Sequence, residues 1–345
     1  MKIGNFIIDQ NSPVFIIAEL SANHNGSLDN ALATIKAAKR AGADCIKLQT
    51  YTADTITLDS DKEDFVIKGT IWDGKKLHTL YQEAYTPWEW HEEIYHVAAA
   101  EGLICFSSPF DHTAVDLLES LNSPAYKIAS FEITDIPLIE YVASKGKPVI
   151  ISTGIAQEED IVLALDACHR MGNYDIALLK CTSSYPAPIE EANMCMVKDL
   201  AERYKVISGL SDHTLGSTVP IVATVFGAKI IEKHFIIDRA IGGPDASFSM
   251  NEAEFTAMVK AVREAEKAIG VVDYHLTEKQ AKGKDFSRSL YIAEDVKAGE
   301  VFTERNIRSV RPGFGLHPKY YHQVLGKTAK VAVEKGTRFS LDFIV

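Results

Sequence analysis

Two lysines lie inside apolar stretches of this sequence. Lys47 falls within residues 45–49 and Lys127 within residues 125–130, and both stretches are typical of buried strands. Because a buried ammonium group is costly without an anion, each lysine is expected to meet a carboxylate or an anionic ligand. An internal ion pair is the alternative, and Glu19, which ends the first apolar run, is a candidate partner for Lys47.

Serines end four successive apolar runs. A single serine at a strand end is common, but four hydroxyls beside fixed lysines form a good cradle for phosphate and carboxylate groups. A substrate that carries both groups, such as phosphoenolpyruvate, fits this set. The four residues are Ser130, Ser152, Ser183 and Ser211.

Two histidines lie at the ends of the last two apolar runs. His213 and His234 could bind one divalent cation and leave positions for water and substrate oxygens, as in a Lewis-acid site. A histidine satisfied within the core is the alternative for either residue alone. Nitrogen and oxygen ligands with water suit Mn, Zn, Co or Mg, and the spacing selects none of them.

Eight apolar runs must position these residues. Segments with helical spacing separate the runs, and several end in glycine, as at Gly146 and Gly172. Eight strand–helix units predict a (β/α)8 barrel (TIM barrel) with its active site at the carboxyl ends of the strands. A doubly wound open sheet is the alternative. The runs are residues 15–19, 45–49, 103–108, 125–130, 148–153, 176–183, 205–212 and 229–235.

The predicted domains are a barrel over residues 1–270, a linker over 271–286 and a small β-rich domain over 287–345. The last is small enough to have only a marginal core by itself. Within the barrel, residues 51–85 form a long connection after the second run. Such a connection usually covers the active face, and a surface insertion is the alternative.

Bulk properties restrict the function. A net charge of −11 argues against a protein that coats nucleic acid. No apolar run approaches the roughly 18 residues that span a bilayer, and no secretory leader is recognisable, so we expect a cytoplasmic protein with neither membrane nor nucleic-acid partners. The five scattered cysteines are interpreted as reduced core residues.

The motifs at the strand ends resemble, in order, those of the sialic acid synthases, a family that condenses phosphoenolpyruvate with amino-sugar aldehydes. The resemblance covers essentially the whole chain. The motifs are AELSANHNG (18–26), KLQT (47–50), KIASFE (127–132), STG (152–154), CTSSYP (181–186), GLSDHT (209–214) and EKHF (232–235).

This resemblance implies functions for individual residues. Phosphoenolpyruvate would be held by Lys47, Lys127 and the four serines. A divalent cation (Mn, Mg or Co) would bind His213 and His234 and polarise the sugar aldehyde, while Glu19 would position water or a sugar hydroxyl. Lys127 is counted with Glu19 and the two histidines as catalytic. Contacts to the sugar would come from Glu132, Tyr185 and Asp245.

Two segments refine the expectation. Residues 69–91 and 242–250 resemble the pseudaminic acid synthases of the family, which implies a diacetamido-trideoxy-altrose substrate; an N-acetylneuraminate or legionaminate synthase is the alternative. The C-terminal domain resembles the antifreeze-protein-like (SAF) module, with Arg311-Pro312-Gly313 as its signature. It implies a domain-swapped homodimer in which Arg311 reaches the sugar in the other subunit.

Two other classes of protein remain open at this point. A Schiff-base aldolase would use Lys127 or Lys180 as its amine. A non-catalytic carbohydrate- or ice-binding protein is suggested only by the C-terminal module, and the ring of polar strand ends argues against it.

Overall fold

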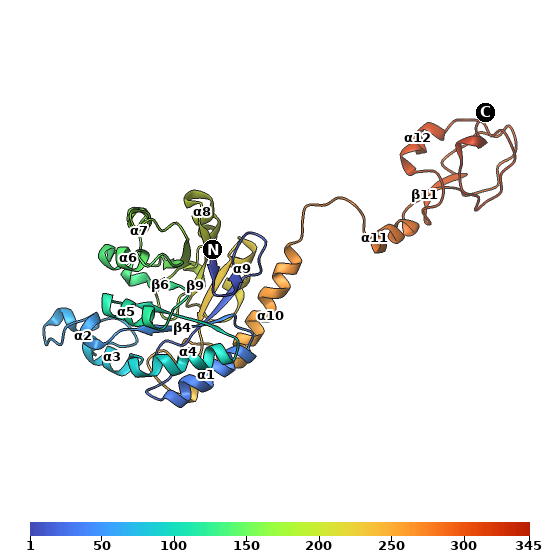
Figure 1. The fold of residues 1–345 in the computed structure, drawn as a ribbon. Coiled ribbons are helices and arrows are strands. Elements are labelled where there is room, and N and C mark those ends of the chain that lie inside the picture. Colours follow the sequence, from blue (N-terminus) through green and yellow to red (C-terminus); the bar gives the residue numbers. More distant parts are fainter. The chain divides into compact units, whose positions relative to one another are not determined.

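The computed structural model describes all 345 residues, which form two compact units, 1–270 and 271–345 (Figure 1). In the first unit, eight parallel strands close into a barrel in chain order, and the last strand pairs with the first. The predicted (β/α)8 fold is confirmed. The strands are β3 (Phe15–Glu19), β4 (Cys45–Thr50), β5 (Ile104–Pro109), β6 (Tyr126–Ile128), β7 (Val149–Ser152), β8 (Ile176–Cys181), β9 (Ile207–Asp212) and β10 (Ile230–His234).

Eight major helices follow these strands and surround the barrel (Figure 1). Their ends carry the expected signals. The Ser27 side chain caps α1, and Asn251 with Glu254 forms a reciprocal capping box on α10. The helices are α1 (Leu28–Arg40), α4 (His91–Ala100), α5 (His112–Ser120), α6 (Ile136–Ala143), α7 (Glu158–Arg170), α8 (Cys195–Tyr204), α9 (Thr218–Val225) and α10 (Glu252–Ile269).

Side chains alternate along each strand between the barrel interior and the helix layer. Outward residues such as Ile46 and Leu48 pack against the helices. Inward residues such as Phe15, Phe106 and Ile150 fill the amino-terminal half of the barrel and are fully buried. The interior therefore has an apolar floor, and the next inward positions, toward the carboxyl ends, are free to carry polar groups.

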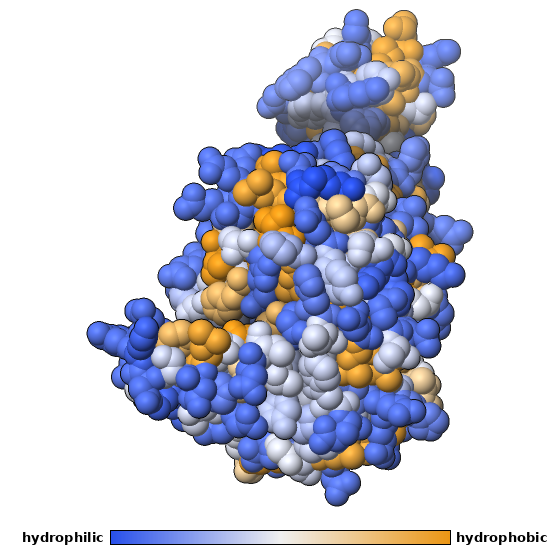
Figure 2. All heavy atoms as spheres, turned by 60° about the vertical axis from the view of Figure 1, so that its left-hand side comes forward, coloured by the Kyte–Doolittle hydropathy of each residue, from blue (hydrophilic) through white to orange (hydrophobic).

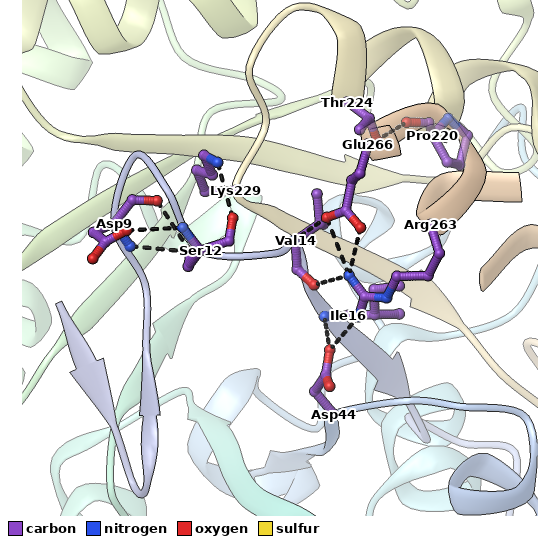
Figure 3. A network of polar contacts seen from close by, with 10 residues as sticks. All are labelled: Asp9, Ser12, Val14, Ile16, Asp44, Pro220, Thr224, Lys229, Arg263 and Glu266. Atoms are coloured by element: carbon purple, nitrogen blue, oxygen red, sulfur yellow. Dashed lines mark hydrogen bonds and ion pairs between the residues drawn. The ribbon is translucent and has the colours of Figure 1, made fainter. Parts of the chain in front are cut away.

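A polar network fastens α10 to the amino-terminal end of the barrel (Figure 3). The Arg263 guanidinium donates to the Val14 carbonyl at 2.8 Å and to Asp44 at 3.1 Å, while Glu266 accepts from the Val14 N–H at 2.5 Å. Lys229, just before β10, donates to the Ser12 carbonyl at 3.0 Å. These contacts close the seam between the first and last strands far from their carboxyl ends.

The long connection after β4 contains two short helices, α2 (Ala53–Ile56) and α3 (Leu77–Ala84). Near the amino terminus, β1 (Lys2–Ile3) and β2 (Phe6–Ile7) form a small hairpin, and Ile3 packs against the apolar floor of the barrel. Four cysteines are buried and unpaired, as interpreted from the sequence, but Cys195 is exposed at the start of α8.

The second unit contains one antiparallel pair, β11 (Ser289–Ile292) and β12 (Ile307–Val310), together with isolated bridges and the short helix α12 (Tyr321–Val324). Its core includes Phe302 and Phe339. The segment 271–286, predicted as a linker, contains the short helix α11 (Glu278–Gly283), which the sequence reasoning missed.

Hydrophilic side chains dominate the face drawn in Figure 2, and hydrophobic ones form small separate groups. None of the helices combines the length and the apolar character that crossing a bilayer requires.

Candidate active site

A cavity of about 720 Å³ opens at the carboxyl ends of the barrel strands. Its walls come from the loops after β3, β5, β6, β8 and β10 and from the long connection 51–85 after β4, which therefore lines the active face. The polar residues of its lining include Ser21, Gln49, Tyr51, Ser130, Glu132, Ser183, Tyr185, His234 and Asp245.

Three charged side chains meet at the base of this site. Lys47 forms a salt bridge with Glu19, and its Nζ lies 3.6 Å from Oε1 of Glu232. It also donates to Ser108 Oγ at 3.2 Å. All are buried inward-facing residues of the barrel. The internal ion pair between Lys47 and Glu19, the alternative considered in the sequence analysis, is thus present, and the Lys47 ammonium group lies near two carboxyl groups.

The two glutamates differ in protonation. Burial raises the pKa of Glu19 to about 7, although Lys47 opposes the shift. Burial also acts to raise the pKa of Glu232, but Lys47 and Lys127 outweigh it, so that pKa is lowered. Near neutral pH, Glu232 is a carboxylate and Glu19 is poised to exchange a proton. Neighbouring carboxyl groups with separated pKa values are typical of acid–base sites.

Lys127 has no carboxylate within salt-bridge distance. Its Nζ donates to Ser152 Oγ at 2.6 Å and to the Ile128 carbonyl at 2.8 Å, and the side chain is almost fully buried. Burial lowers the pKa of this ammonium group below its usual value. A buried cation without a counter-ion is costly. The missing charge is what an anionic ligand would supply.

Of the four serines in the predicted cradle, Ser152 contacts Lys127 and two others contact each other. Ser183 Oγ donates to Ser130 Oγ at 2.8 Å, and Ser130 Oγ accepts from the Ile155 N–H at 3.1 Å. Gly154 permits this approach, because a Cβ there would lie 2.2 Å from Ser183 Oγ and 2.6 Å from Ser130 Oγ. Ser211 lies apart from the other three and donates to Glu232 at 3.3 Å.

The two histidines also converge. The ring centroids of His213 and His234 are 5.4 Å apart, and the Tyr185 ring packs 4.4 Å from that of His213. Nδ1 of His213 is 3.0 Å from the Thr182 carbonyl, which accepts its proton and leaves Nε2 free. Nδ1 of His234 is buried without a hydrogen-bond partner and lies 3.8 Å from Asp245.

This donor set fits a divalent cation. Burial lowers the pKa of His234 well below its usual value, so the imidazole is neutral and able to bind a metal. No group of three histidine, cysteine or acidic side chains is close enough to enclose an ion. His213 and His234 would hold the cation with two imidazoles and would leave positions for water and substrate oxygens, as in a catalytic rather than a structural site.

The remaining predicted residues divide between the two units. Glu132 and Tyr185 line the cavity, and burial raises the pKa of Glu132 to about 7. Arg311 belongs to the second unit, so its contact with the sugar stays a prediction. Lys180 points outward and donates to the Cys181 carbonyl at 2.5 Å. Of the two amines considered for a Schiff base, only Lys127 therefore faces the barrel interior.

Glu232 and Trp72 are among the residues of the site that had no predicted role. Glu232 lies two positions before His234, so the alternation along β10 could have placed it inside the barrel. Trp72 belongs to the long connection, where no periodicity guides a prediction. Its indole N–H donates to the Pro244 carbonyl at 3.3 Å and joins two loops of the cavity wall.

Comparison with known proteins agrees with this geometry. Residues 34–274 match the NeuB family, and residues 287–345 match the SAF domain. The chain belongs to the NeuB family. The sialic acid synthase resemblance seen in the motifs is thereby confirmed, as is the SAF module.

Several curated relatives of this NeuB-family chain are synthases. It is 51% identical to the pseudaminic acid synthase of Campylobacter jejuni (strain 81-176) over 97% of both chains. It is 47% identical to that of Helicobacter pylori over 96% of this chain and 98% of the relative. The N,N'-diacetyllegionaminic acid synthase of Campylobacter jejuni is 35% identical over 91% and 95%. The chain is accordingly an enzyme.

Two solved structures share the fold. The spore coat polysaccharide biosynthesis protein spsE from Bacillus subtilis has a TM-score of 0.68 and 34% identity, covering 100% of this chain and 99% of that one. The N-acetylneuraminic acid synthetase from Leptospira borgpetersenii has a TM-score of 0.73 and 29% identity, covering 82% and 94%.

Proposed function

We propose that this enzyme is a pseudaminic acid synthase. It joins phosphoenolpyruvate to 2,4-diacetamido-2,4,6-trideoxy-L-altropyranose with the uptake of water, and it releases pseudaminic acid and phosphate. The observation that carries the proposal is the buried ammonium of Lys127, which contacts one hydroxyl and one backbone carbonyl but no counter-ion, in a barrel whose carboxyl end also holds two convergent imidazoles. About half of the residues are shared with pseudaminic acid synthases over nearly the whole chain, which supports the choice within the family.

Phosphoenolpyruvate supplies the missing negative charge. Lys127 with Ser130, Ser152 and Ser183 forms one anion-binding group, and Lys47 with Ser211 forms a second on the side of Glu232. A molecule with a phosphate and a carboxylate at opposite ends uses both groups. Fixed donors in a water-poor site hold such charges at little reorganisation cost.

Glu19 and Glu232 then take part in the reaction between phosphoenolpyruvate and the sugar. Carbon 3 of the enol attacks the aldehyde carbon, water adds at carbon 2, and the bond between carbon 2 and the phosphate oxygen breaks. A divalent cation on His213 and His234 would supply Lewis acidity toward the aldehyde oxygen. Glu19, with its pKa about 7, exchanges a proton with the incoming water or a sugar hydroxyl, and the ionised Glu232 stabilises the positive charge that develops near carbon 2.

One wall of the cavity favours a deoxy sugar. The long connection contributes apolar side chains to it, among them Ile56, Ile67, Leu77 and Leu80, and Phe110 adds to them. A trideoxy sugar with two acetamido groups presents three methyl groups, which suit such a wall. A hydroxymethyl group, as in N-acetylmannosamine, would lose solvation there. The legionaminate precursor also carries these methyl groups and remains the alternative substrate.

The small C-terminal unit has a proposed part as well. We propose that the SAF domain acts in a domain-swapped homodimer, where Arg311 contacts the sugar in the partner's barrel. The match of residues 287–345 to the SAF domain supports this arrangement.

A single assay tests the assignment. Phosphate release is followed with phosphoenolpyruvate, a divalent cation and each of three sugars: the diacetamido altrose, its legionaminate counterpart and N-acetylmannosamine. Release is expected to be fastest with the altrose. Release with another of the sugars alone would reassign the enzyme within the family. Borohydride trapping of a pyruvate adduct without phosphate release would support the Schiff-base aldolase instead.

A further inference from the structure

A buried ion pair lies on the outer side of the barrel wall, away from the cavity. Nζ of Lys233 on β10 is 2.5 Å from Oδ2 of Asp212 on β9, and the two side chains are 2% and 1% exposed. The two residues are direct partners in the parallel ladder. Their neighbours Ser211 and Glu232, one position earlier, face inward and contact each other at 3.3 Å, so alternation directs Asp212 and Lys233 outward.

The same two groups also hold the chain beyond β9. Oδ1 of Asp212 accepts from the Thr214 N–H at 2.9 Å and from the Thr214 hydroxyl at 2.8 Å, while Lys233 donates to the Thr214 carbonyl at 2.5 Å. Both carboxylate oxygens and the ammonium group are therefore satisfied without water. The result is a closed cluster, Asp212–Thr214–Lys233, in which every member is buried.

This cluster brackets both imidazoles of the site. His213 lies between Asp212 and Thr214, and His234 follows Lys233 directly. Any change in the separation of Asp212 and Lys233 therefore moves the backbone that carries the two histidines. His213 has two additional contacts, from Nδ1 to the Thr182 carbonyl at 3.0 Å and to Cys181 Sγ at 3.7 Å, whereas Nδ1 of His234 has no hydrogen-bond partner.

The energetics point to positioning rather than to stability. A buried ion pair often contributes no more to folding than apolar residues of the same size would. Its directional contacts do fix one arrangement of the groups around it. Second-layer contacts of this kind orient metal ligands and tune the affinity for the ion.

We propose that Asp212, Thr214 and Lys233 are positioning residues that set the spacing of His213 and His234 and thereby the affinity for the divalent cation. This inference rests on the proposed metal-dependent synthase. None of the three residues lines the cavity, and Asp212 and Lys233 face away from it.

The test measures Mn²⁺ binding directly, by the electron paramagnetic resonance signal of the free ion, on the full chain without substrates. Lys233→Met is expected to weaken binding about 10- to 100-fold. The matched control is Lys229→Met. Lys229 directly precedes the same strand, and its Nζ contacts the Ser12 carbonyl at the other end of the barrel (Figure 3). The control variant should bind Mn²⁺ as the unmodified chain does.

Three further variants separate positioning from folding. Lys233→Arg keeps the charge and donors and should recover most of the affinity. Thr214→Val removes one hydroxyl contact and should give a smaller loss. The double variant Asp212→Leu with Lys233→Met leaves no unpaired buried charge. It should keep the melting temperature of the unmodified chain, and its affinity for Mn²⁺ should nevertheless be lower. If Lys233→Met alone does not fold, these three variants test whether the cluster positions the histidines.

The outcomes are distinct. Folded Lys233 and Asp212 variants that bind Mn²⁺ as tightly as the unmodified chain would overturn the positioning assignment while leaving the proposed function intact. An unmodified chain that binds no divalent cation would overturn the metal site and this assignment together. Weaker binding in Lys233→Met with normal binding in Lys229→Met supports the proposal.

Discussion

Glu19 and Glu232 share the ammonium group of Lys47 at the base of the cavity, and their pKa values move in opposite directions. Burial raises the pKa of Glu19 to about 7, whereas Lys47 and Lys127 lower the pKa of Glu232. The same three side chains thus hold one ionised carboxylate and one carboxyl group that titrates near neutrality. This asymmetry makes the site sensitive to pH.

The stability of the barrel should fall as pH rises through about 7. Glu19 retains its proton to about pH 7 in the folded chain but only to 4.5 when unfolded, so its contribution is complete below 4.5 and lost above 7. A shift of this size corresponds to about 3 kcal/mol. Glu132 adds a second contribution in the same direction. Urea midpoints measured between pH 5 and 8 should decline less in Glu19→Gln and least in Glu19→Gln with Glu132→Gln. Equal slopes in all three proteins would contradict the assignment.

Replacing either lysine should abolish turnover, but the two changes should affect stability in opposite ways. Lys127→Met removes a buried cation that has no counter-ion, so the free energy of unfolding should stay the same or increase, and protection by phosphoenolpyruvate should disappear. Lys47→Met leaves two carboxylates without their cation and should cost about 3–5 kcal/mol. Urea unfolding with and without phosphoenolpyruvate distinguishes the two. Destabilisation by Lys127→Met would indicate a hidden structural partner.

Gly154→Ala should weaken phosphoenolpyruvate binding. Its Cβ would push Ser183 and Ser130 apart, and losing a hydrogen bond to a charged group costs about 1.5–3 kcal/mol, which is roughly 10- to 150-fold in KM. Gly283→Ala is the control, because nothing lies within 4 Å of the Cβ it would add. An unchanged KM in the Gly154 variant would mean that the serines do not hold the substrate.

Chelation should stop the reaction, and Mn²⁺ should restore it in the unmodified enzyme. His213→Ala, which removes one of two protein ligands, should reduce kcat/KM at least about 100-fold and should not be restored by moderate Mn²⁺. Phosphate release is the readout. Full activity of His213→Ala without added metal would defeat the metal site.

The apolar wall should determine sugar choice. Ile67→Thr places a hydroxyl in the wall and should reduce the preference for the deoxy altrose over N-acetylmannosamine by about 10-fold, which is the scale of one small group in an apolar pocket. Leu58→Thr changes an exposed side chain of the same connection and serves as the control. The ratio of kcat/KM values for the two sugars is measured. If the ratio of kcat/KM values is the same in both variants as in the unmodified enzyme, the apolar wall does not determine sugar choice.

The alternation of side chains explains how much the sequence predicts. Lys47, Lys127 and His234 occupy inward positions of recognisable strands, so the barrel and the strand-end residues follow from periodicity. Trp72 lies in an irregular connection, and its contact with Pro244 depends on how two loops meet. The Asp212–Lys233 pair requires the register of β9 and β10, which an apolar run alone does not specify.

Apolar side chains fill the amino-terminal half of the barrel, so the cavity opens at the carboxyl ends of the strands. Lys47 and Lys127 are buried two positions before Gln49 and Ala129, which line the cavity, and the long connection lines its outer part, so in the proposed reaction the anion would enter before the sugar. In the proposed reaction the products would leave in the reverse order, with the nine-carbon sugar acid before inorganic phosphate. Kinetics with each product added should therefore show phosphate competing with phosphoenolpyruvate for the empty enzyme.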